Sequence, residues 1–257
     1  TADSYDKILQ NPDVNAVVIA TPIKTHYELT RKALLTGKDV FVEKPITNSI
    51  KQAKELVKLA AKKKLILFVG HIFSYHPVLD KIKRLTRHEP LKYAGFVWNK
   101  FGTFNEELIY NLLSHDVATA LDIFDSSSTT LLFGKVVLDK PTKIRVLENR
   151  GIMSSLDVLF MRLDFNGDKS ATIYINRASN IKNKTVTIVT AKNVYLWDND
   201  QLFKLDKKMA SFKLIYKSAK PPLEVECAEF IKCLETIKKP RTSGEFGLEV
   251  VKILSRI

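Results

Sequence analysis

The sequence is poor in the features that mark several classes of protein. Of its 257 residues, 2 are cysteines, 9 are glycines and 9 are prolines. So few cysteines exclude a disulfide scaffold, and the glycine and proline counts exclude collagen-like and low-complexity chains. Cys227 and Cys233 lie six residues apart and match no metal-ligand spacing. We therefore expect no metal site, and we interpret both as reduced packing residues of a cytoplasmic protein.

Long apolar runs are also missing, so no segment of the sequence predicts a membrane span. The first residues, TADSYDKILQNPD, lack the apolar core of a signal peptide. Apolar residues still make up 45% of the chain, which is enough for a sizeable core and excludes disorder. We expect one large domain or two smaller ones, with no membrane partner.

Acidic residues are in deficit, since 41 Lys and Arg face 28 Asp and Glu for a net charge of +13. Such a charge could serve nucleic acid, a membrane surface or an anionic small ligand. The lysines fall in short runs such as 62–64, with no aromatic residues interleaved and no DNA- or RNA-binding motif. We interpret these lysines first as solvated side chains on the outer faces of helices. The second interpretation is that their positive charge attracts an anionic small ligand, and we expect no nucleic-acid partner.

The first seventy residues alternate between strand and helix patterns. Continuous apolar runs at 14–20, 39–43 and 65–70 predict buried strands. Amphipathic stretches between them predict two helices, the first with a Thr25/Glu28 capping box and the second with Ser49/Gln52. The order strand–helix–strand–helix–strand indicates a parallel sheet.

Beyond residue 77 the pattern changes to a mostly strand-like region over about 91–216. A helix over about 106–124 and a loop at 126–130 interrupt it, and helices return at 224–237 and 245–256, the last with a Thr242/Glu245 capping box. We expect an α/β protein: an incomplete Rossmann-type parallel sheet in residues 1–75, then an α+β domain in 76–257 with a large open, mostly antiparallel sheet and closing helices.

Two predicted strand ends carry unusual side chains, and ligands bind at such ends in parallel sheets. Thr21 and Pro22, with His26 shortly after, follow the first strand, and Glu43-Lys44-Pro45 follows the second. The backbone of a lysine before proline is restricted, so Lys44 is a candidate to point into the crevice. Taken alone, the tripeptide favours the interpretation of Lys44 as an ordinary surface lysine.

A second candidate cluster lies on the helix expected over 106–124. Asn111 and His115 are i and i+4, so they share a face beside the apolar stripe of that helix. A polar pair there suits the wall of a cleft. The competing interpretation of His115 is a structural histidine with its hydrogen bonds satisfied.

Taken in order, these motifs resemble the Gfo/Idh/MocA family of nicotinamide-dependent oxidoreductases. The set consists of TP-x-x-x-H (21–26), EKP (43–45), GH (70–71) and a helix carrying HD (115–116). Residues 221–257 are similar to the closing helices of that family, and GHIFSYHP (70–77) is similar to its branch acting on nucleotide sugars.

The resemblance implies hydride transfer between NAD or NADP and a sugar or cyclitol carbon. It implies that Lys44 binds the reacting oxygen and that His115 is the general base, with Asn111 where the family has an Asp. Cofactor contacts are implied for Thr21, Pro22, His26, Glu43, Lys44 and Pro45, and substrate contacts for His71, Tyr75 and His76.

The chain also departs from the family. The strand and G-x-G-x-x-G that open a Rossmann domain are not in the sequence, so we expect that roughly two strands and a helix are missing and that this piece binds dinucleotide poorly. Asn111 supplies no charge to His115. Ser74-Tyr75-His76-Pro77 stands where an Arg-containing segment is usual, and Lys184 is followed by Thr185 and Val186 instead of continuing a Lys-x-Arg pattern.

Three functions therefore compete. The first is an NAD(P)-dependent dehydrogenase or reductase of a sugar, cyclitol or nucleotide sugar. The second is a non-catalytic relative that binds a ligand or serves in assembly, and the third is a nucleic-acid-binding protein. In the family the open face of the large sheet makes a dimer, so we expect a homodimer or homotetramer through strands such as those at 171–190.

Overall fold

The computed structural model describes residues 4–125 and 139–257, and the loop expected at 126–130 lies outside them. The chain divides into two compact units. Unit 1 comprises Thr1–Ser74 and Leu223–Arg256, and unit 2 comprises Tyr75–Pro222 with Ile257. The break after Ser74 lies one residue from the expected boundary. The closing helices, however, belong to unit 1 and not to the second domain in which the sequence had placed them.

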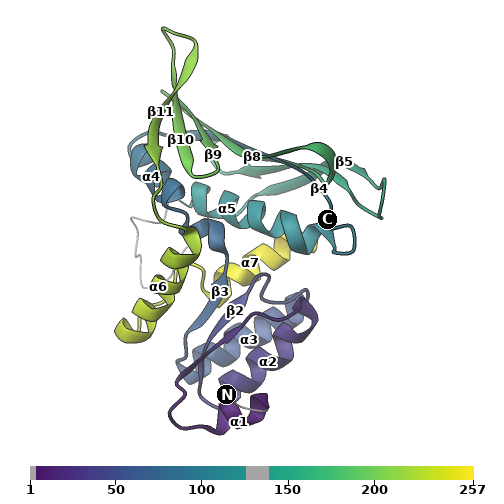
Figure 1. Ribbon diagram of the computed structural model, residues 1–257, viewed down its shortest axis with the longest axis vertical. Coiled ribbons are helices and arrows are strands. Elements are labelled where there is room, and N and C mark those ends of the chain that lie inside the picture. The colour runs from purple at the N-terminus through teal and green to yellow at the C-terminus, as the bar shows by residue number, and fades with distance from the viewer. Residues whose placement is uncertain (1–3, 126–138) are drawn as a thin grey trace. The chain divides into compact units, whose positions relative to one another are not determined.

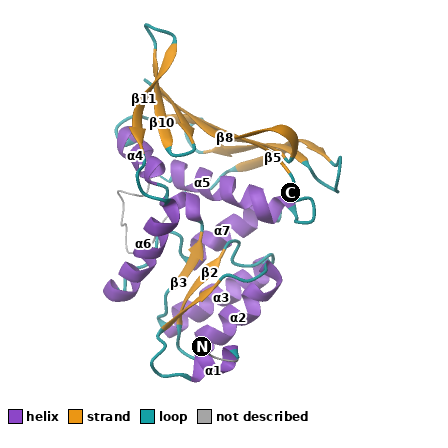
Figure 2. Ribbon diagram, in the orientation of Figure 1, coloured by secondary structure: helices purple, strands orange, loops and turns teal. Residues whose placement is uncertain are grey.

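Unit 1 is built on a three-stranded parallel sheet, as the strand–helix alternation predicts. Its strands β1 (Ala16–Ile19), β2 (Asp39–Glu43) and β3 (Leu67–Gly70) lie in the order β1-β2-β3. The crossovers are α2 (Ile23–Leu35) and α3 (Ile50–Lys63), and a short helix α1 (Tyr5–Gln10) precedes β1. Figure 2 shows these helices beside the strands of the small sheet.

The capping residues agree with the sequence only in part. Ser49 caps α3 as expected, and its hydroxyl accepts the Gln52 N–H. The prediction for Thr25 is wrong, because α2 already begins at Ile23 and the Thr25 hydroxyl donates back to the Pro22 carbonyl. The N-cap position of the last helix, α7 (Gly244–Leu254), is Ser243 and not Thr242, and the Ser243 side chain makes no capping hydrogen bond to the helix.

Apolar packing on both faces of the small sheet explains why the closing helices belong to unit 1. On one face Val40, Val42 and Val69 join a core with α2, α3 and residues Leu248 and Val251 of α7. On the other face the rings of Phe41 and Phe68 stack 4.8 Å apart. Phe230 of α6 (Pro222–Thr236) meets them edge-on at 5.5 and 5.4 Å. The two helices thus cover opposite faces and bury apolar side chains of β2 and β3.

Unit 2 contains an eight-stranded sheet in the order β11-β10-β9-β8-β4-β7-β6-β5. Only the β4–β7 pair is parallel, which confirms the expected mostly antiparallel sheet. The strands are β4 (Leu91–Phe101), β5 (Lys143–Arg150), β6 (Val158–Phe165), β7 (Lys169–Asn176), β8 (Ala178–Thr190), β9 (Val194–Asp198), β10 (Gln201–Asp206) and β11 (Ser211–Lys217).

One face of this sheet is covered by α4 (Pro77–Thr86) and α5 (Ser114–Phe124), and the described residues place no helix on the other (Figure 1). Burial alternates along the strands accordingly. In β6, Leu159, Met161 and Leu163 are buried, while Phe160 and its outward neighbours are partly exposed. None of the helices formed by the described residues is long and apolar enough to cross a membrane.

Candidate active site

The loops after β1 and β2 are tied together by His26. Because the strands are parallel, their carboxyl ends gather at one edge of the sheet. The His26 side chain is buried, with Nε2 2.7 Å from the Thr21 carbonyl oxygen and Nδ1 2.9 Å from the Pro45 carbonyl oxygen. The imidazole therefore holds the Thr21-Pro22 loop against the turn that follows β2. Its placement along a cofactor remains a prediction.

The turn after β2 presents Lys44, which is half-buried and joined to Pro45 by a cis peptide bond. The Lys44 backbone N–H donates to Glu43 Oε2 at 3.1 Å. Glu43 pairs in register with Gly70 of β3, and a Cβ at that glycine would lie 3.3 Å from the Glu43 carboxyl carbon and 2.9 Å from the Phe41 ring. The glycine thus leaves the space that the Glu43 carboxylate and the Phe41 ring occupy.

His71 follows Gly70 and is buried against Phe246 of α7, with ring centroids 5.5 Å apart. Neither ring nitrogen has a hydrogen-bond partner among the described residues. Burial, aided by the positive charge of Lys44, lowers the pKa of His71 to about 3. The imidazole is therefore neutral at physiological pH and adds no charge next to the lysine.

Tyr75 and His76 stand at the start of unit 2. Tyr75, the last residue of the 3₁₀ turn η1 (Ile72–Tyr75), is buried. His76 caps α4, because its Nδ1 accepts the Val78 N–H at 3.2 Å, and its ring lies 4.9 Å from that of Trp197. Burial lowers the pKa of His76 to about 4, so this cap is neutral. The structure thus gives His76 a helix-capping role, and its substrate contact stays a prediction.

Asn111 and His115 lie on adjoining but different helical segments of unit 2. Asn111 belongs to a π-helical turn, η2 (Ile109–Leu113), which runs directly into α5, where His115 is the second residue. The regular helix predicted over 106–124 is therefore wrong for its first part. A π turn widens the backbone by one residue and occurs often at functional sites. Both side chains are half-buried.

An ion pair next to His115 was not predicted from the sequence. Lys184 Nζ of β8 lies 3.3 Å from Oδ1 of Asp116 and 3.5 Å from the centroid of the Trp98 ring. The Trp98 ring in turn lies 5.9 Å from that of His115. Burial raises the pKa of the Asp116 carboxyl, and Lys184 opposes that shift. The HD dipeptide and Lys184 were visible in the sequence, but their contact depends on the register of β4 and β8.

The two tryptophans of the chain lie on the same face of the large sheet as Lys184. Trp98 pairs with Lys184 across β4 and β8, and Val186, two residues further along β8, pairs with Trp197 of β9. Alternate residues of a strand share a face, so both indoles flank the lysine on the side that also carries His115. Broad aromatic surfaces beside a few polar groups are typical of small-ligand sites.

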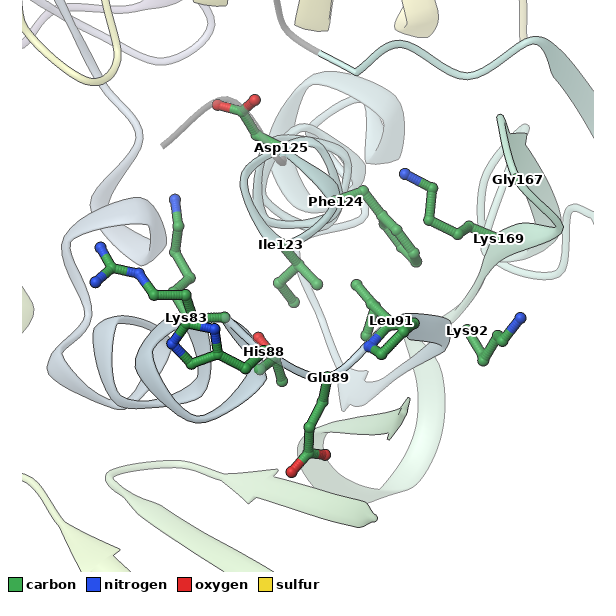
Figure 3. Close-up of a pocket in the computed structure, with 13 residues that line it drawn as sticks. Lys83, His88, Glu89, Leu91, Lys92, Ile123, Phe124, Asp125, Gly167 and Lys169 are labelled. Carbon is green, nitrogen blue, oxygen red and sulfur yellow. The ribbon is translucent and has the colours of Figure 1, made fainter. Parts of the chain in front are cut away.

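A pocket of about 500 Å³ lies elsewhere in unit 2, at the far end of α5. Figure 3 shows Lys83, Phe124 and Lys169 on its walls. Phe124 is nine residues beyond His115, which is about 14 Å along a helix. Lys83 is paired with Asp122, and Lys169 with Asp139. Because two of its ammonium groups are neutralised and it lies away from His115, this pocket is separate from the candidate site.

Known proteins similar to this chain are NAD(P)-dependent oxidoreductases. Residues 1–71 match the model of the oxidoreductase family GFO_IDH_MocA, NAD-binding Rossmann fold. The chain is 25% identical over 251 residues to scyllo-inositol 2-dehydrogenase (NAD(+)) of Bacillus subtilis, covering 93% of this chain and 72% of that protein. It is 26% identical over 176 residues to UDP-N-acetylglucosamine 3-dehydrogenase of Acidithiobacillus ferrooxidans, covering 68% of this chain and 51% of that protein.

A solved structure of that UDP-N-acetylglucosamine 3-dehydrogenase has the same fold. It superposes with a TM-score of 0.86 at 20% identity, over 100% of this chain and 80% of the other. The chain thus spans between about half and three quarters of the length of these two curated relatives. Residues 1–71 thus match the Gfo/Idh/MocA family of oxidoreductases, and the chain over its whole length has the fold of a solved dehydrogenase to which it is similar.

Proposed function

We propose that the chain forms part of a dehydrogenase or reductase that transfers a hydride between NAD(P) and a carbinol or ketone carbon of a sugar, cyclitol or nucleotide sugar. The observation that carries the proposal is the Glu43-Lys44-Pro45 turn at the carboxyl end of β2, which His26 holds against the loop after β1. An ammonium group fixed at this edge of a parallel sheet is suited to the oxygen of a reacting carbinol.

The chemistry of this edge fits a nicotinamide cofactor. It offers the Thr21 hydroxyl, the half-buried ammonium of Lys44 and the neutral imidazole of His71. We assign cofactor contacts to Thr21, Pro22, Glu43, Lys44 and Pro45, with His26 acting through the loops it joins. Bound NAD or NADP supplies the acceptor or donor of the hydride. The sequence has no G-x-G-x-x-G motif and no acidic residue that selects between the two, so the proposal includes both.

Lys44 and His115 have separate roles in the proposed reaction. The Lys44 ammonium donates a hydrogen bond to the reacting oxygen and stabilises the negative charge that develops there. The His115 imidazole accepts the hydroxyl proton during oxidation and returns it during reduction, a task that suits a group titrating near neutral pH. Asn111 orients that ring without charging it, and Lys184 neutralises the neighbouring Asp116 carboxylate.

Support for a sugar-type substrate comes from unit 2. Half-buried Trp98 supplies an apolar surface on the side of the sheet that carries His115, and buried Trp197 supports the same face. Such surfaces suit the C–H faces of a hydroxylated ring. We assign substrate contacts to His71, Tyr75 and His76 as well. The net charge of +13 favours a pyrophosphate-bearing substrate, and hence the nucleotide-sugar branch.

The test is a titration of the full-length protein with NADH and NADPH, followed by turnover on a panel that includes free cyclitols and nucleotide sugars. Lys44→Met and His115→Asn should each lower kcat about 100-fold or more, because each removes a charge or proton transfer from the transition state. Lys51→Met, on the outer face of α3, is the matched control and should turn over normally. Turnover like that of the wild type in both site variants would remove the assignment.

A non-catalytic relative that binds a ligand or serves in assembly is the second candidate, and Asn111 favours it because this residue brings no charge to His115. Cofactor binding without turnover of any sugar on the panel would support it. For either function we propose a cytoplasmic homodimer or homotetramer joined through the open face of the large sheet, where Phe160 and Tyr174 pack edge-on at 6.3 Å. Tyr174→Glu should then lower the mass measured by light scattering.

A further inference from the structure

Glu226 of α6 is a buried carboxyl group that the proposed reaction does not use. Its side chain is 0% exposed, and neither carboxyl oxygen has a hydrogen-bond partner among the described residues. An ionised carboxylate in such a place would lose its hydration without compensation. A buried carboxyl group without a hydrogen-bond donor is therefore stable only if it is protonated or has a partner of another kind.

Packing of α6 places this group near the turn that carries Lys44. Phe230, one helical turn after Glu226, meets the rings of Phe41 and Phe68. Glu43 lies two residues after Phe41 and therefore on the same face of β2. Gly70 faces the same side of β3 and leaves the room that the Glu43 carboxyl group occupies. Glu226 and Glu43 thus face each other from a helix and a strand of one unit.

The charge that acts most strongly on Glu226 has the same sign as its own carboxylate. Burial, followed by the negative charge of Glu43, raises the pKa of Glu226 to about 8. The thiol of Cys227, next along α6, has its pKa raised by burial and by the same two carboxyl groups. The nearest titratable groups after β2 and β3 are Lys44 and His71, and the His71 ring lies against Phe246 of α7 on the opposite side of the sheet. A single proton on the pair would relieve the repulsion.

We propose that Glu226 is a positioning residue for Lys44: its buried carboxyl group donates a hydrogen bond to the Glu43 carboxylate, which it faces across the gap between α6 and β2. Glu43 in turn accepts the backbone N–H of Lys44. The order of donors and acceptors runs from the Glu226 O–H through the Glu43 carboxylate to the Lys44 amide, so a group on α6 fixes the turn after β2. The consequence for catalysis rests on the proposed function, whereas the shared proton does not.

The shared proton can be observed without turnover. Infrared spectra of the full-length protein at pH 7 should contain the carbonyl stretch of a protonated carboxyl group that is absent from Glu226→Gln. This band should fade as the pH is raised through about 8. Glu235→Gln, at an exposed position of the same helix, should leave the band unchanged. A difference spectrum without the band at pH 7 would overturn the proposal, whatever the enzyme's activity.

Kinetics test the positioning role. Glu226→Ala should lower kcat about tenfold with little change in KM, because the turn that carries Lys44 is displaced. Glu226→Gln should restore most of kcat, since its amide N–H₂ also donates to Glu43. It should also remove the loss of kcat that we expect for the wild type above about pH 8. Turnover of Glu226→Ala like the wild type, or failure of Glu226→Gln to restore it, would contradict the role. If neither the wild type nor any variant turned over a substrate, the proposed function would fail, but the infrared result would still stand.

Discussion

The two units each bury a carboxyl group near a proposed catalytic residue, and they stabilise it in opposite ways. In unit 1, Glu226 faces another acid, Glu43, and its pKa is raised to about 8. In unit 2, Asp116 faces the ammonium of Lys184 at 3.3 Å. One group is held neutral by a proton, whereas the other has a cation beside it that favours its ionised form against the effect of burial. The first arrangement depends on pH, whereas the second depends on one side chain.

This contrast predicts that Lys184→Met lowers the free energy of unfolding more than any other variant considered below. The variant leaves Asp116 buried without a counter-charge, and removal of one partner from a buried pair typically costs about 3 kcal/mol. Urea unfolding at pH 7 should show the loss in the free energy of unfolding. The double variant Lys184→Met/Asp116→Asn should recover most of it, because no charge is then left unpaired. A single variant as stable as the wild type would show that Asp116 is not ionised.

Glu226→Gln, in contrast, should raise the free energy of unfolding at alkaline pH. Because the pKa of Glu226 in the folded state, about 8, lies above its usual value, the folded state binds the extra proton between about pH 4.5 and 8. Stability of the wild type therefore falls as pH rises through this window, and glutamine does not titrate. The variant should be more stable than the wild type by about 2 kcal/mol at pH 8.5 and equal to it near pH 4. A gain that does not depend on pH would contradict this account.

The smallest effect belongs to a pair at the surface. Lys239 Nζ lies 2.9 Å from Glu245 Oε1, but both side chains are about half exposed. Lys239→Met should change the free energy of unfolding by about 0.5 kcal/mol or less, because water and salt screen such a pair. A loss as large as that of Lys184→Met would mean that burial does not distinguish the pairs in this protein.

Elements governed by local patterns could be predicted from the sequence. The three strands of unit 1 and their parallel pairing follow from apolar runs and alternation with helices, and the mostly antiparallel sheet of unit 2 follows from alternating side chains. The ordered motifs predicted the family and drew attention to Lys44, which the structure places at a strand end as expected.

Features that depend on distant contacts could not be predicted. Assignment of α6 and α7 to unit 1 depends on Phe230 and Leu248 finding the two faces of a sheet about 180 residues earlier in the chain. The Lys184–Asp116 pair depends on the register between β4 and β8. The π turn at Asn111 shifts a helix by one residue, which an apolar stripe does not reveal. Burial of Glu226 is hidden for the same reason, since the sequence shows only one more glutamate on a helix.

The discontinuity of unit 1 has a consequence for how the protein is made. Residues 1–74 leave the ribosome first, but α6 and α7 follow only after the whole of unit 2. Until then the rings of Phe41 and Phe68 lack Phe230, and the apolar cluster behind β2 lacks Leu248 and Val251. Unit 2 is contiguous from Tyr75 to Pro222, so it can fold before unit 1 has received its last two helices. During synthesis, the part of unit 1 that carries Lys44 therefore exposes apolar side chains until α6 and α7 cover them. A nascent chain arrested before residue 223 would be a substrate for chaperones.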